Sequence, residues 1–273
     1  MRKLLATGIA AGAFIAVAAL VPAHAAEGDA QLSVLHGIPD LTVDVYVNGE
    51  LTLDNFTPGT LAGPLSLAAG TYSVAITASD ATDDSNPVLG PIDLPLAAGG
   101  NYTAVAHLTA AGEPSATLFT NDISMLDAGQ GRLTVRHVAA APAVDILAGG
   151  SPVITDLVNP DEKVLNLPAG VVSASVAATG TTAPVIGPAD VNVAEGVNTI
   201  VYAWGSLEAN NLQLAIQTID GLHSNPTSIP AGSAGLVATN SPFDATGLWI
   251  GAGFAGLLVA AAGAVAVRAH ARR

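Results

Sequence analysis

The sequence of 273 residues predicts an all-β protein built from two tandem β-sandwich domains of immunoglobulin-like architecture. A duplication of about 100 residues and many short runs of alternating apolar and polar residues, ended by Gly, Pro or Asn, carry this prediction. Between the two ends, no long segment has the 3.6-residue period of an amphipathic helix. The duplicated unit has the size of a domain and is much longer than a solenoid repeat.

The two copies share blocks of similar sequence in the same order. Leu32-Ser33-Val34-Leu35-His36 recurs as Leu133-Thr134-Val135-Arg136-His137, and an Asp follows each His after eight residues, as Asp44 and Asp145. Three later blocks also match, namely 65–70 with 165–170, 87–93 with 184–190, and 99–101 with 196–198. We therefore expect one domain at 28–127, the first repeat, and another at 130–223, the second repeat.

Alternating residues predict seven or eight short strands in the first repeat. Within 42–47, the side chains of Val43, Val45 and Val47 would share one face, as in a half-buried strand. Asn48-Gly49 follows, the pair that favours a type I′ hairpin turn. The other expected strands are 32–36, 51–56, 71–77, 92–96, 101–108 and 116–120. Neither repeat has the Cys pair of immunoglobulin domains, so the prediction concerns architecture only.

Charge and Cys content exclude several classes of function. The chain has 8 Lys and Arg against 22 Asp and Glu, a net charge of −14, and the acidic residues all lie between Glu27 and Asp244. Within that span Arg132, Arg136 and Lys163 are the only Lys or Arg residues. Such a surface repels nucleic-acid phosphates, so we expect no nucleic-acid partner. Without Cys, disulfides, thiolate metal sites and Cys nucleophiles are excluded.

The N-terminus has the features of an export signal at residues 1–25. Arg2 and Lys3 precede an apolar stretch at 4–21, and small residues at Ala23 and Ala25 predict cleavage after Ala25.

The C-terminus has the features of a membrane anchor. Residues 248–267 form an uncharged apolar run of twenty residues, about 30 Å long as a helix, and therefore predict a transmembrane helix. The basic tail at 268–273 would lie in the cytoplasm, with the acidic region outside the cell. Residues 224–247, rich in Ser, Pro and Gly, would form a flexible stalk. The membrane is thus the first expected partner.

The region around the stalk also resembles the cell-wall sorting signal that sortases read in Gram-positive bacteria. Its five-residue motif is Leu-Pro-x-Thr-Gly, or Leu-Ala-x-Thr-Gly in many actinobacteria. Leu236 and Thr239 match this motif, whereas Val237 and Asn240 depart from it. The resemblance implies attachment to the cell wall through Thr239, and a plain membrane anchor is the alternative. Either arrangement places the protein at the cell surface.

The openings of both repeats resemble the DUF4397 family. In the first repeat the resemblance is carried by Val34, His36, Pro39, Asp40, Val43, Asp44, Val45, Tyr46 and Gly49. In the second it is carried by His137, Pro142, Val144, Asp145 and Gly150. This resemblance implies a secreted or surface β-domain, often present in tandem, and it brings no established activity.

The repeated residues His36, Asp44, His137 and Asp145 are the first candidates for a site. A His–Asp pair could act as a general base or orient a metal ligand. Without a nucleophile elbow or a His-Glu-x-x-His motif, however, we expect structural histidines whose ring nitrogens bind backbone groups. We predict no catalytic residue, no cofactor and no metal.

Two features leave binding alternatives open. The acidic loop at 80–86, with Asp80, Asp83 and Asp84, could offer oxygen ligands to Ca²⁺, although it lacks EF-hand spacing and a solvated loop is the simpler interpretation. Trp204 could be an exposed platform for a glycan, although a Trp at a strand end is more often part of a core. We therefore expect a non-enzymatic surface protein, a spacer or binding module whose external ligand is unidentified. A calcium-dependent or glycan-binding adhesin and, last, an envelope enzyme are the alternatives.

Overall fold

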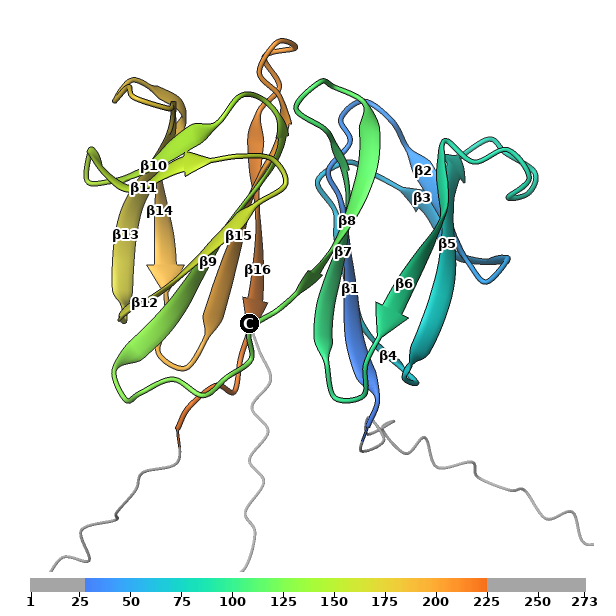
Figure 1. Ribbon diagram of the computed structural model, residues 1–273, viewed down its shortest axis with the longest axis horizontal. Helices are drawn as coiled ribbons and strands as arrows, with labels where there is room; N and C mark the ends of the chain where they lie inside the picture. Colours follow the sequence, from blue (N-terminus) through green and yellow to red (C-terminus); the bar gives the residue numbers. More distant parts are fainter. Residues whose placement is uncertain (1–27, 225–273) are drawn as a thin grey trace, which may run out of the picture. The chain divides into compact units, whose positions relative to one another are not determined.

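The computed structural model describes residues 28–224, and in this part of the chain every regular element is a β-strand (Figure 1). The all-β prediction is therefore confirmed. Within this range, no helix is long and apolar enough to cross a membrane. The predicted signal peptide, stalk, transmembrane helix, basic tail and sorting motif lie outside the described residues.

Eight strands of the first repeat form two antiparallel-rich sheets of four strands each. They are β1 (Ala30–His36), β2 (Val43–Val47), β3 (Glu50–Phe56), β4 (Leu61–Leu67), β5 (Gly70–Ala78), β6 (Leu89–Leu96), β7 (Asn101–Leu108) and β8 (Pro114–Thr120). One sheet has the order β4-β1-β7-β8 and the other the order β3-β2-β5-β6. Strands β1 and β7 are parallel neighbours.

The second repeat has the same topology. Its strands are β9 (Gln130–Ala140), β10 (Val144–Ala148), β11 (Ser151–Leu157), β12 (Glu162–Pro168), β13 (Gly170–Ala178), β14 (Pro184–Val193), β15 (Asn198–Ser206) and β16 (Gln213–Ile219). The sheet orders β12-β9-β15-β16 and β11-β10-β13-β14 match those of the first repeat strand for strand. In immunoglobulin domains the first strand lies beside the second. Here it lies between the fourth and seventh strands, so the strand order is not that of an immunoglobulin domain.

The turns follow the local sequence. Asn48 and Gly49 both have positive φ, 52° and 81°, as the predicted hairpin turn between β2 and β3 requires. Strand β4 was not expected, because Gly63-Pro64 interrupts its apolar pattern. Its edge position in the sheet explains why a Pro is tolerated there.

Apolar side chains fill the space between the sheets differently in the two repeats. In the second repeat they form one continuous cluster from Leu133 and Val135 to Val201. In the first repeat they form two separate clusters, one around Leu32 and Leu94 and the other around Val45 and Ile76.

A third cluster joins the two repeats, which belong to one compact unit within the described residues. The side chains of Leu35, Val105 and Phe119 from the first repeat pack with those of Val138, Ile200, Tyr202 and Trp204 from the second. The connecting segment is held by the second repeat, because the Leu126 N–H donates to the Leu222 carbonyl. The unit therefore contains its own cores and its own contacts between the repeats.

Candidate ligand-binding cavity

The two repeated histidines are buried and bound to backbone groups. His36 is fully buried at the end of β1, its Nε2 lies 2.6 Å from the Leu41 carbonyl, and its Nδ1 accepts the Ile38 N–H. His137 makes the same contacts with the Pro142 carbonyl, at 3.0 Å, and the Ala139 N–H. Burial lowers the pKa of both rings, opposed by the hydrogen bond to the carbonyl. Each neutral ring thus holds the bend after its strand.

The repeated carboxylates of Asp44 and Asp145 accept hydrogen bonds from the neighbouring strand and not from the histidines. Asp44 accepts the Asn55 N–H at 2.7 Å, and Asp145 accepts the Asp156 N–H at 3.0 Å. Asp145 also accepts from Gly180 N–H and the Thr179 hydroxyl. The backbone hydrogen bonds from Asp156 and Gly180 lower the pKa of Asp145.

These contacts show what the candidate residues can do chemically. The hydrogen bonds of His36 and His137 go to backbone groups, and within residues 28–224 neither ring is hydrogen-bonded to Asp44 or Asp145. The structure therefore does not form the imidazole–carboxylate pair that a general base would need.

The acidic loop and Trp204 occupy different settings. Asp83 accepts the Ser85 N–H at 3.0 Å, a contact within the loop, and no group of three or more metal-ligating side chains occurs in the part of the chain that the structure describes.

Trp204 is only 3% exposed and packs in the cluster between the repeats, over Gly59. Its ring is therefore a core side chain, and the interpretation as an exposed glycan platform is wrong.

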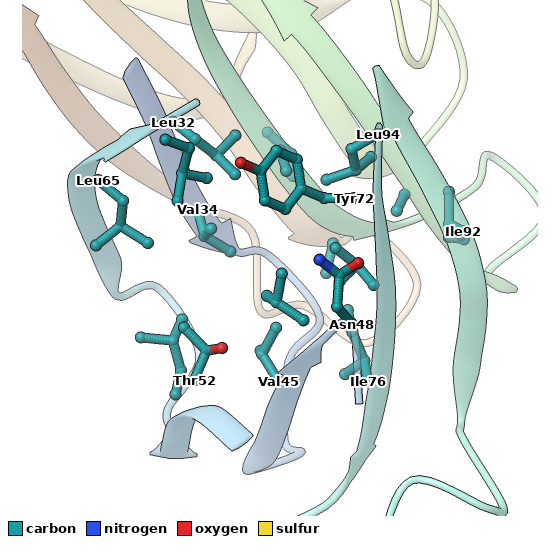
Figure 2. Close-up of a pocket in the computed structure, with 18 of the residues that line it drawn as sticks. Leu32, Val34, Val45, Asn48, Thr52, Leu65, Tyr72, Ile76, Ile92 and Leu94 are labelled. Carbon is teal, nitrogen blue, oxygen red and sulfur yellow. The ribbon is translucent and has the colours of Figure 1, made fainter. Parts of the chain in front are cut away.

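A cavity of about 280 Å³ lies between the two sheets of the first repeat (Figure 2). Figure 2 shows Val34 and Leu65 of one sheet and Tyr72, Ile76 and Leu94 of the other around this space. The lining joins members of both first-repeat clusters, so the cavity occupies the break between them. Its volume lies near the lower end of the range for small-molecule pockets, roughly 300–1,000 Å³.

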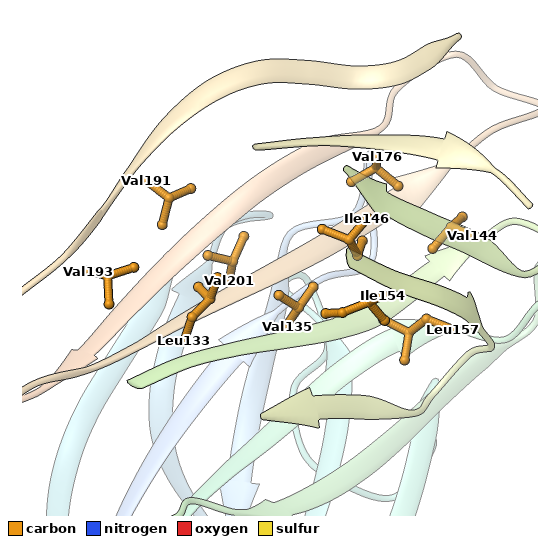
Figure 3. Packing of buried hydrophobic residues seen from close by; sticks show 10 residues of the cluster. All are labelled: Leu133, Val135, Val144, Ile146, Ile154, Leu157, Val176, Val191, Val193 and Val201. Carbon is orange, nitrogen blue, oxygen red and sulfur yellow. The ribbon is translucent and has the colours of Figure 1, made fainter. Parts of the chain in front are cut away.

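The corresponding space in the second repeat is filled (Figure 3). The pocket lined by Leu133, Val135, Ile146, Val201 and Leu214 measures only about 30 Å³. The lining differs at several positions: Ile146 is larger than its counterpart Val45, whereas Val172, Ala189 and Val191 are smaller than Tyr72, Ile92 and Leu94. The largest gains in the second repeat come at two positions where the first repeat has Ala. Val201, which pairs with Val135, replaces Ala104, which pairs with Val34, and Leu214 replaces Ala116.

Exposure of the core-facing residues differs in the same way. Val135 and Ile154 of the second repeat are buried, at 5% and 6% exposed. Their first-repeat counterparts, Val34 and Leu53, are only half-buried although they face the core. The cavity of the first repeat is therefore reached by solvent.

The mouth of the cavity lies at the β2–β3 hairpin. Of the lining residues, Asn48, Glu50 and Thr52 are exposed, and all three come from this hairpin. Asn48 is fixed there, since its Oδ1 accepts the Ser73 N–H at 2.9 Å. The remaining lining is mostly aliphatic. An apolar interior with a few polar groups at one end is typical of a site for a small apolar or amphiphilic molecule.

The energetics favour an occupant. A ligand that fills the space removes its own apolar surface from water and restores dispersion contacts to the lining.

Comparison with known proteins adds a family to this geometry. A DUF4397 domain spans residues 30–147. The DUF4397 match, described as a domain of unknown function, covers all of β1–β8 and ends within β10. It therefore includes the whole cavity, whereas most of the second repeat lies outside it. No curated protein matches the chain.

Sequence reasoning missed the cavity in the DUF4397 domain and the buried Arg136. The small side chains of Ala104 and Ala116, set against Val201 and Leu214, were a signal for the cavity once the repeats were aligned strand by strand. A net charge treats Arg136 as part of the surface, whereas its side chain is buried and stands where the first repeat has the apolar Leu35.

Proposed function

We propose that the protein is a non-enzymatic cell-surface binding module, in which the first of two tandem β-sandwich domains takes up a small apolar or amphiphilic ligand. The second domain, a further DUF4397-like copy, serves as a packed platform. A signal peptide directs export, and a C-terminal helix or a sortase-processed end holds the unit outside a Gram-positive cell.

The difference between the repeats carries the proposal. Two units with the same strand order have cavities of about 280 Å³ and 30 Å³ at the same position. Protein interiors are normally packed as tightly as organic crystals, so a space of this size is unusual in a domain core. The second repeat shows that this topology can be filled with Val and Leu side chains.

Binding of a neutral apolar dye tests the proposal. Residues 26–227, first shown to unfold cooperatively, are titrated with N-phenyl-1-naphthylamine, whose fluorescence rises in apolar surroundings. This piece contains all the residues that the structure describes, and it is studied without detergent, which would compete for the cavity. We expect saturable binding of one dye per chain.

A variant based on the second repeat is the control. Ala104→Val combined with Ala116→Leu introduces the side chains found at Val201 and Leu214, and it should abolish dye binding without loss of the cooperative transition. Should the wild-type chain bind no dye, or should the filled variant bind equally well, the proposal would be overturned. Ala106→Val is a second filling variant in case the double variant does not fold.

Anchoring is tested separately by fractionating native cells and identifying the C-terminal peptide by mass spectrometry. A chain ending at Thr239, released only by wall-digesting enzymes, would establish sortase attachment. A chain ending at Arg273 and extracted by detergent would establish the membrane anchor. Recovery of the protein in the cytosol would contradict surface display.

A further inference from the structure

Resting on the proposed function, we infer that the cavity selects amphiphiles with a single alkyl chain and a cationic or neutral head group, and discriminates against anionic ones such as fatty-acid carboxylates. The chain enters between the sheets, and the head stays at the mouth beside Glu50.

The shape of the cavity selects the chain. Its interior is lined by aliphatic side chains from both sheets, and about 280 Å³ has room for about ten methylene groups at the density of packed organic solids. The exposed polar lining residues Asn48, Glu50 and Thr52 lie together at the hairpin. The two hydroxyls along the walls are already hydrogen-bonded, that of Tyr72 to the Ala68 carbonyl and that of Thr117 to His107 Nε2. A molecule with one polar end and one apolar chain matches this division.

The charge at the mouth selects the head group. Glu50 is an exposed lining residue and carries a carboxylate. Asp84 also lies at this hairpin, because a Cβ added to Gly49 would be 3.8 Å from its Oδ2. A cationic head is attracted to these carboxylates, and an anionic head is repelled.

No basic side chain of the first repeat offsets this charge. Residues 28–127 contain 12 Asp and Glu and no Lys or Arg. The two Arg residues of the second repeat are buried and engaged, Arg132 with Asp122 and Arg136 with Glu162. The formal charge of the first repeat is therefore negative, and the attraction that it exerts on a cationic head should weaken as salt is added.

Three ligands with the same ten-carbon chain test the inference. Decyltrimethylammonium, 1-decanol and decanoate, each below its micelle concentration, are titrated against residues 26–227 by calorimetry and by displacement of the neutral dye. We expect the cation to bind at least tenfold more tightly than decanoate, with decanol between them, and the ratio of cation to decanoate to shrink at high salt.

Matched variants separate the effect of the Glu50 carboxylate at the mouth from the effect of the overall negative charge of the repeat. Glu50→Gln should weaken binding of the cation by about threefold and leave decanol unchanged, in keeping with the modest strength of exposed charge pairs. Glu113→Gln removes the same charge from the β7–β8 turn, outside the cavity lining. It should change binding of neither the cation nor decanol. Tetramethylammonium, a head group without a chain, should not displace the dye.

The outcomes distinguish the inference from the proposed function. If neither the neutral dye nor any of the three ligands binds, the proposed function itself fails. If the dye binds and none of the three ligands does, the inference alone is overturned. If decanoate binds as tightly as the cation, or if Glu113→Gln acts like Glu50→Gln, the cavity binds apolar ligands but does not select them by head group. Displacement by the cation that persists in the Ala104→Val/Ala116→Leu variant would show surface binding and would also overturn the inference.

Discussion

The guanidinium group of Arg136 in the second repeat lies over the ring of Phe119 in the first, with Cζ 4.2 Å from the ring centroid. The same side chain donates to Glu162 at 2.7 Å, to the Tyr202 hydroxyl at 2.8 Å and to the Asn121 amide oxygen at 2.8 Å. This buried cation is thus both stacked on an aromatic ring and hydrogen-bonded to three side chains. The contact joins the repeats through charge, hydrogen bonds and an aromatic ring together.

Replacing Arg136 should strongly destabilise the protein. Arg136→Ala leaves Glu162, Tyr202 and Asn121 without their donor, and we expect the free energy of unfolding to fall by about 3 kcal/mol, as for other buried pairs that lose one partner. Urea denaturation measures the change. Lys163→Ala, an exposed cation on β12, should change stability by less than about 0.5 kcal/mol. Equal effects of the two variants would contradict the structural role of Arg136.

Buried histidines should make stability depend on pH. Burial lowers the pKa values of His36, His107 and His137 below the ordinary value of 6.5, and the nearby His137 adds to the lowering at His107. The unfolded chain therefore binds more protons than the folded chain as the pH falls below about 6.5. We expect the free energy of unfolding to be fully retained above that pH and to decrease as the pH falls below it.

His137→Gln should flatten this pH dependence, because it removes one of the buried rings whose pKa is lowered. Urea midpoints measured from pH 7.5 to 5 provide the comparison. A wild-type curve that does not change over this range would refute the assignment.

Asp145 should contribute a second, more acidic dependence. Hydrogen bonds from Asp156 and Gly180 stabilise its carboxylate and lower its pKa, so its contribution is present above its ordinary pKa of 3.8 and is lost as the pH falls through the lowered value. Asp145→Asn should therefore lower the melting temperature at pH 7 and reduce the loss of stability below pH 4. Thermal melts at both pH values test this, with the exposed Asp190→Asn as control.

Core truncations should cost different amounts in the two repeats. Val135→Ala opens a new void in a packed cluster and should lower stability by about 2 kcal/mol. Val34→Ala, the matched change, enlarges a space that already exists and should cost at most about 1 kcal/mol. A larger loss for Val34→Ala would show that the cavity is not open in solution.

Local sequence was enough to predict much of the fold. Alternation in 42–47, the Asn48-Gly49 turn and most first-repeat strands follow from contacts between near neighbours, so they were correctly predicted. Strand β4 was not predicted, because Gly63-Pro64 interrupts its apolar pattern and because its pairing with β1 comes from residues about thirty positions away. The strand order was not predicted either, because it depends on a long-range pairing that places β1 beside β7.

The sequence by itself determined the all-β class, the duplication, the acidic surface and the expectation of export and anchoring, because periodicity, composition and charge are properties of short segments. Only the tertiary structure decided that His36 and His137 bind backbone, that Trp204 and Arg136 are buried between the repeats, and that a cavity opens in one repeat and not in the other. These features depend on how far apart two sheets lie and on which side chains meet between them. Distances across a core are set by residues far apart in the chain, and no local pattern records them.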